Sequence, residues 1–177
     1  MSPVLETSSI RNNLRNESLK VQIFGKSLSD YVKFERGFLI LVLVVGLARL
    51  SLSLLGVPNA KIKLVSITLA FLLGLVYYSV KTYTSGFGSY KHLLPLSVLP
   101  VVLGNGIVIA GIVIAILTHK DNIFSAPEFS PGKVDGKNWG HVGGHVVAMI
   151  VLPLIFWVIG SWFMFLAKKM SAGRKLA

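Results

Sequence analysis

The chain has 177 residues, no cysteine and a formal net charge of +11, and 53% of its residues are hydrophobic. This composition, with a mean hydropathy of +0.70, excludes an ordinary soluble domain. The lack of cysteine excludes disulfides, thiolate metal sites and covalently attached haem.

A basic leader, residues 1–36, opens the chain. Its apolar residues from Ile10 to Phe34 recur at helical spacing, with basic residues between them. This spacing predicts an amphipathic helix, and Gly25 is a point where the helix could break. Such a helix can lie on an anionic lipid surface or contact a partner protein. The leader is much longer than the basic start of a signal peptide, so we expect the first apolar stretch to be an uncleaved anchor.

Four long apolar stretches follow, each about as long as a helix needs to cross a hydrocarbon core of ~30 Å. They are continuous runs of Leu, Ile and Val, unlike the alternating strands of a membrane barrel. The sequence therefore predicts an all-α domain over residues 37–167, with four transmembrane helices in an up-down bundle and a basic tail at 168–177. The expected spans are 38–55, 64–80, 93–117 and 142–166, with an outer loop at 118–141.

Charge supports this division of the chain. Carboxylates are costly in hydrocarbon, and every acidic residue lies outside the four stretches. Twelve basic residues fall in the leader, the loop between spans two and three, and the tail, against five on the opposite side. This bias predicts a multi-pass protein with both termini in the cytoplasm, most simply in a bacterial inner membrane. It also accounts for the net charge without nucleic acid as a partner.

Small residues repeat every four positions on two of the spans. Such ladders let helix backbones approach closely within a bundle or against another subunit, and the sequence does not choose between these. The candidate packing residues are Ser66, Ala70 and Gly74 on span two, and Gly140, Gly144 and Ala148 on span four.

Three histidines are expected near the outer face. His141 and His145 share one face of span four, and His119 closes span three on the same side of the membrane. With Asp121 and Glu128 from the outer loop, they form a candidate site for a divalent metal. His119 and His145 could instead hold a haem or a pigment. We favour a purely structural role over either of these, because an HxxxH spacing alone is not diagnostic.

Arg49 is the charged residue inside a span, close to the outer end of span one. It could extend its guanidinium to the interface, or it could contact a ligand. His145 is expected at a similar depth, so the two together favour an anion. The candidates are Asp121 or Glu128, a lipid phosphate, or a quinone-like headgroup. In the same loop, apolar residues among prolines at 123–131 suggest a fixed lid or a partner contact.

No arrangement of residues predicts a reaction, so the chain is not expected to be an enzyme. The interpretation that we favour is an accessory or structural subunit of a larger respiratory or photosynthetic membrane complex. It would stabilise assembly and contact membrane lipids, quinone or pigment. Two alternatives remain: a metal- or haem-binding redox protein that uses His119, His141 and His145, and a transporter or channel component.

Overall fold

The computed structural model describes residues 22–127 and 135–173. Four of the described helices are long and apolar enough to cross a membrane, which makes the chain a multi-pass membrane protein. The chain divides into two compact units that meet between Phe34 and Glu35, inside the first long helix. Each unit is described by itself.

A short β-hairpin precedes the first span. Strands β1 (Gln22–Ile23) and β2 (Lys26–Ser27) pair antiparallel, with Gln22 opposite Ser27. The two turn residues between them, Phe24 and Gly25, both have positive φ angles of 54° and 84°, as a two-residue hairpin turn requires. The amphipathic helix expected from Ile10 to Phe34 is therefore absent at 22–27, and its part up to residue 21 lies outside the described residues.

Helix α2 (Leu28–Leu54) begins directly after the hairpin. Ser27 and Asp30 cap it reciprocally: the Asp30 N–H donates to Ser27 Oγ at 3.2 Å, and the Ser27 N–H donates to Asp30 Oδ2 at 2.8 Å. The helix is followed by Gly56, whose φ of +79° is left-handed. There the Val57 N–H donates to the Leu52 carbonyl, which is the bonding of a Schellman C-cap.

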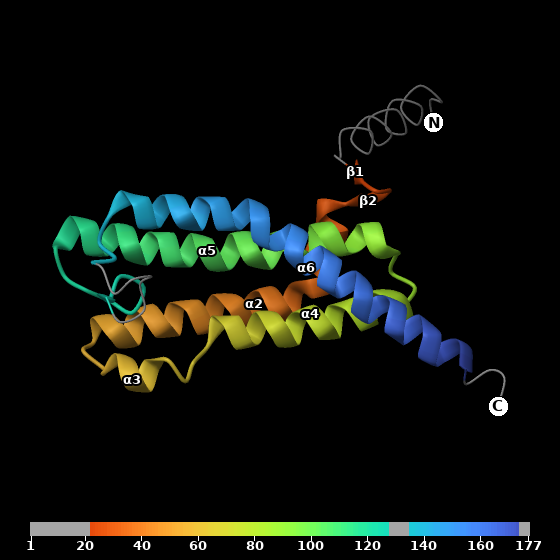
Figure 1. Ribbon diagram of the computed structural model, residues 1–177, viewed down its shortest axis with the longest axis horizontal. Coiled ribbons are helices and arrows are strands. Elements are labelled where there is room, and N and C mark those ends of the chain that lie inside the picture. Colours follow the sequence, from red (N-terminus) through yellow and green to blue (C-terminus); the bar gives the residue numbers. More distant parts are fainter. Residues whose placement is uncertain (1–21, 128–134, 174–177) are drawn as a thin grey trace, which may run out of the picture. The chain divides into compact units, whose positions relative to one another are not determined.

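The remaining helices follow in chain order (Figure 1). They are α3 (Asn59–Ile62), α4 (Ile67–Thr84), the 3-10 turn η1 (Tyr90–His92), α5 (Leu93–Thr118) and α6 (Trp139–Gly173). Helix α5 continues through Pro100. Pro100 lacks an N–H, so the carbonyl four residues earlier receives no helical hydrogen bond from it.

Aromatic and aliphatic side chains from α2, α4, α5 and α6 form the core of this unit. Phe38 lies against Phe71 and Tyr78, with ring centroids 6.4 Å and 5.5 Å away. Gly74 makes this approach possible, since a Cβ there would come within 2.2 Å of the Phe38 ring. Gly46 likewise allows Ile107 to approach α2, since a Cβ at Gly46 would come within 2.7 Å of the Ile107 side chain.

The two small-residue ladders have different surroundings. On α4, Ser66 caps the helix by accepting from the Leu69 N–H at 3.2 Å. Ala70 is buried, and Gly74 contacts Phe38. On α6, Gly140 and Gly144 are exposed, and a Cβ at Gly144 would meet nothing within 4 Å. Among the described residues, the α4 ladder packs inside this unit and the start of the α6 ladder does not.

Candidate functional site

A cavity of about 470 Å³ lies among α2, α4, α5 and α6, and polar side chains from all four helices line it, Thr68 of α4 among them. Arg49 comes from α2, Asn105 from α5, and His141 and His145 from α6. We call it the Arg49 cavity. Its other walls are largely apolar, and its volume falls in the range of about 300–1,000 Å³ that is typical of small-molecule sites. The lining residues also include Ile67, Thr68, Phe71, Leu72, Gly104, Val108, Ile123, Phe124, Leu152 and Phe156.

His145 is oriented by Asn105, a residue that the sequence did not single out for the site. The Asn105 Nδ2 donates to the Val101 carbonyl at 2.9 Å, which leaves Oδ1 to face His145. The distance from this oxygen to His145 Nδ1 is 2.7 Å. Because the amide oxygen can only accept, His145 Nδ1 carries the proton and donates it. In the neutral ring, Nε2 keeps its lone pair.

His141 is held in the same tautomer. Its Nδ1 lies 3.0 Å from the Gly136 carbonyl oxygen, which also can only accept. The two imidazole rings are neighbours, with centroids 5.1 Å apart and a tilt of 39°. Each histidine therefore uses Nδ1 to fix its ring and leaves Nε2 open for a ligand or a proton.

Arg49 is half-buried, and its Nε is a buried donor without a hydrogen-bond partner. The guanidinium carbon lies 5.6 Å from the centroid of the Phe124 ring, which is within cation–π range. Phe124 itself rests on Gly111 of α5, where a Cβ would come within 2.5 Å of the ring. Arg49 thus faces the cavity with donor capacity that the described protein leaves unused.

The segment 122–126, which we call the lid, contributes Ile123 and Phe124 to the cavity wall. The sequence suggested a fixed lid or a partner contact over 123–131, and residues 128–131 lie outside the described residues. All five residues of the lid are buried. Asn122 donates to the Gly111 carbonyl at 2.6 Å and accepts from the Phe124 N–H at 2.9 Å. The Ile123 N–H donates to Ser53 Oγ at 2.8 Å. These bonds tie the lid to both α2 and α5.

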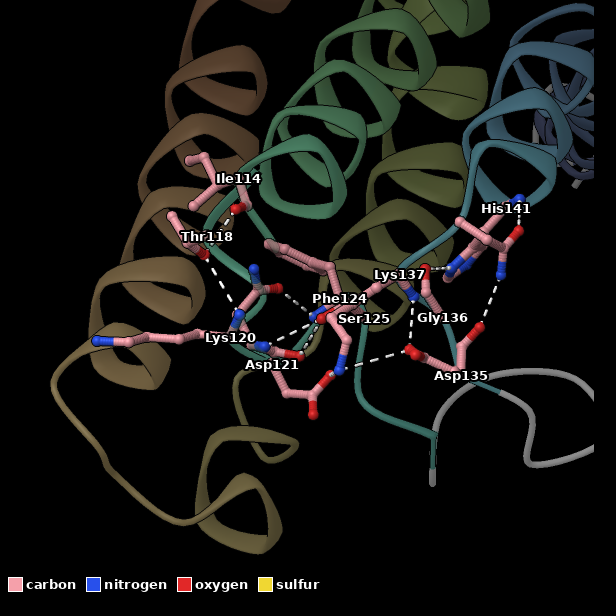
Figure 2. A network of polar contacts seen from close by, with 12 residues as sticks. Ile114, Thr118, Lys120, Asp121, Phe124, Ser125, Asp135, Gly136, Lys137 and His141 are labelled. Atoms are coloured by element: carbon pink, nitrogen blue, oxygen red, sulfur yellow. Dashed lines mark hydrogen bonds and ion pairs between the residues drawn. The ribbon is translucent and has the colours of Figure 1, made fainter. Parts of the chain in front are cut away.

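Outside the lid, polar contacts join three charged residues, Asp121, Asp135 and Lys137 (Figure 2). Asp121 lies 2.8 Å from Lys137 Nζ, and Asp135 lies 3.6 Å from the same nitrogen. The hydrogen bond that the Lys137 ammonium donates to Asp121 raises the pKa of Lys137 above its usual range. The ammonium therefore stays charged through neutral pH and loses its proton only at alkaline pH. Asp121 is thus paired with Lys137, and Glu128 lies outside the described residues.

The proposed metal ligands are only partly brought together. His141 and His145 line the cavity, whereas His119 is exposed at the C-cap of α5 and does not line it. Among the described residues, no three His, Asp or Glu side chains are close enough to hold a metal ion. The metal and haem sites stay predictions.

His119 offers a direct test of its own role. It has a left-handed backbone, with φ of 56°, at the position where glycine usually ends a helix. We therefore expect His119→Gly to raise the free energy of unfolding by about 1 kcal/mol, since glycine adopts this conformation without strain. Thermal unfolding in detergent measures this, and metal content is determined on the same samples. A loss of bound metal or haem in His119→Gly would instead identify His119 as a ligand.

Glu35, like Arg49, has buried polar atoms without a hydrogen-bond partner among the described residues, and the sequence placed it in the leader and not in a site. It lies on α2 one turn before the expected start of span one, and its side chain is 0% exposed. Neither carboxyl oxygen has a hydrogen-bond partner. The signal that could have revealed it is local: Tyr31, Val32, Phe34 and Phe38 surround it in sequence, so the apolar helix already extends past residue 35.

Comparison of the chain with models of protein families, with curated proteins and with solved structures gives no match.

Proposed function

We propose that this protein holds an amphipathic molecule with an oxygen-acceptor headgroup, a phospholipid or a quinone, in the Arg49 cavity. We further propose that it acts as an accessory subunit of a larger membrane complex of respiratory or photosynthetic type. The observation that carries the ligand proposal is the buried, unpartnered Arg49 Nε at the wall of a largely apolar cavity. A headgroup oxygen would satisfy this donor, and the apolar walls suit an apolar body.

The histidines fit the same class of ligand. An open Nε2 on His141 or His145 accepts a hydrogen bond from a hydroxyl, as a quinol or a lipid glycerol carries. When protonated, the same nitrogen donates to a phosphate or a carbonyl oxygen. Arg49 and these two rings therefore supply both kinds of hydrogen bond around one headgroup.

The subunit proposal draws on α6. In the most apolar 18-residue stretch of α6, only 11% is buried within the protein. The corresponding share for the span that contains α5 is 39%. Large apolar residues and the exposed Gly144 share this helix. Lipid alone can cover an apolar face, but an open small residue also suits close contact with another helix.

The topology that goes with this proposal is an up-down bundle in a bacterial inner membrane, with both termini in the cytoplasm. The excess of basic residues in the leader, the loop between spans two and three, and the tail supports it. The Arg49 cavity would then lie in the outer half of the membrane.

Metal binding is the second candidate, and one observation favours it. Ligating histidines generally use their second ring nitrogen to donate to an acceptor, as His141 and His145 both do. Against it stands Arg49, because a guanidinium in the same cavity repels a divalent cation.

The experiment is a gentle detergent purification of the full chain from its native membrane, followed by mass spectrometry of copurified proteins and of extracted lipids and quinones. We expect stoichiometric partner subunits and one enriched species, phospholipid or quinone, bound to the protein. An absorption spectrum and metal analysis on the same sample test the alternatives. A lone protein without enriched amphiphile would overturn the proposal, and a Soret band, pigment absorption or one metal per chain would favour a cofactor instead.

A further inference from the structure

A second cavity lies beside Glu35 and differs from the Arg49 cavity in volume and in the polar side chains that line it. It measures about 30 Å³, room for one or two water molecules. We call it the Glu35 cavity. Its walls come from α2, α4, α5 and α6 and are mostly apolar; they comprise Phe38, Phe71, Gly74, Leu75, Tyr78, Ser79, Leu93, Leu96, Ser97, Pro100 and Phe156.

The two serine hydroxyl groups on these walls already donate to backbone carbonyl groups. Ser79 donates to the Leu75 carbonyl at 2.6 Å. Ser97 contacts two carbonyl oxygens, those of Leu94 at 2.8 Å and Pro153 at 3.0 Å. The serine oxygens keep lone pairs, so both side chains can still accept a hydrogen bond from a group in the cavity. Tyr78 is the other titratable side chain on the walls, and no described Lys, Arg or His lines this cavity.

An ionised carboxylate in these surroundings would have neither a hydrogen bond nor a counter-ion. Isolated charges are too costly to bury, so the group must bind a proton or a cation, or draw in water. A metal cation commonly needs about six oxygen ligands. The cavity is too small and too apolar to surround a metal ion in this way, whereas a proton needs only the carboxyl group and an acceptor.

We propose that the Glu35 cavity is a proton-binding site, in which the Glu35 carboxylate takes up one proton from water and releases it again. The neutral acid then donates its O–H to a water in the cavity or to a serine oxygen. No other co-reactant is needed, because the reaction is the protonation of a carboxylate. This site is independent of the ligand proposed for the Arg49 cavity.

Infrared spectroscopy of the full chain in liposomes tests the proposal, because a protonated carboxylic acid has a carbonyl band that a carboxylate lacks. We expect this band at neutral pH in buffer free of sodium and potassium, and we expect it to disappear reversibly as the pH rises. Glu35→Gln, which is nearly isosteric, should lose the band. Asp121→Asn is the matched control and should keep it, because Asp121 is half-exposed and paired with Lys137.

A chemical measurement on the unmodified protein makes the test independent of the variants. An apolar carbodiimide reacts with protonated carboxyl groups, and peptide mass spectrometry locates the adduct. We expect labelling at Glu35 that declines as the pH rises and is unchanged when sodium or potassium replaces choline. Absence of both the band and the label at every pH would overturn the proposal. Protection by sodium or potassium at constant pH would overturn it in favour of a metal cation site.

Discussion

Replacing Asn122 with alanine is expected to lower the free energy of unfolding by about 3 kcal/mol. The substitution deletes the donor to the Gly111 carbonyl and the acceptor for the Phe124 N–H, both of which are buried. Each buried polar group left without a partner costs about 1–3 kcal/mol. Thermal unfolding in detergent, monitored by circular dichroism, measures the loss.

Two variants show which bond matters. Asn122→Asp keeps an acceptor for Phe124 but cannot donate to the Gly111 carbonyl when ionised, so it should be at least as destabilising as alanine. Asp121→Asn, one residue earlier, weakens only an exposed ion pair and should leave stability almost unchanged. Equal stability of Asn122→Ala and the wild type would mean that the lid does not hold the end of α5.

The second large effect is expected from Arg49→Leu, which should remove most of the bound amphiphile. A hydrogen bond to a charged group contributes about 1.5–3 kcal/mol, which corresponds to roughly a 10- to 150-fold loss of affinity. The measurement is the amount of phospholipid or quinone per protein after gentle purification, by quantitative mass spectrometry. Arg49→Lys should retain an intermediate amount, because an ammonium keeps the charge but loses the planar donors of the guanidinium.

Arg36→Leu is the control for charge. Arg36 lies on the same helix, is exposed and does not line the Arg49 cavity. Its substitution should leave the ligand content unchanged. Full ligand content in Arg49→Leu, with normal insertion and assembly, would mean that the arginine only extends toward the interface.

Hydropathy was sufficient to predict the four long helices, because a bilayer imposes both their length and their lack of charge. The helix limits differ from the expected spans by up to ten residues at the start of α2 and seven at the end of α6, and the hairpin at 22–27 was missed. There the apolar residues Ile23 and Phe24 fit a helical spacing, but a left-handed Phe24-Gly25 turn reverses the chain.

Within the candidate site, spacing along one helix was more informative than spacing across helices. His141 and His145 are four residues apart, so any helix brings them to one face. Asn105 lies on another helix, and its contact with His145 depends on how α5 and α6 are rotated about their axes. Side-chain packing between the helices determines that rotation, and the spacing of residues along one helix does not predict it. The same reason explains why Gly74 and Gly144, alike in sequence, have different surroundings.

Two phenylalanines belong to both cavities. Phe71 and Phe156 line the Arg49 cavity and the Glu35 cavity alike, and their rings meet edge to face with centroids 6.1 Å apart. The interior is therefore partitioned by side chains and not by backbone, so rotamer changes alone could join an acid, two imidazoles and a guanidinium into one compartment. Gly104 keeps Phe71 in place, since its bare backbone accepts the ring where a Cβ would come within 2.5 Å. Phe71 and Phe156 therefore act as a side-chain barrier, and water passes between the Glu35 cavity and the Arg49 cavity only when one of these rings moves.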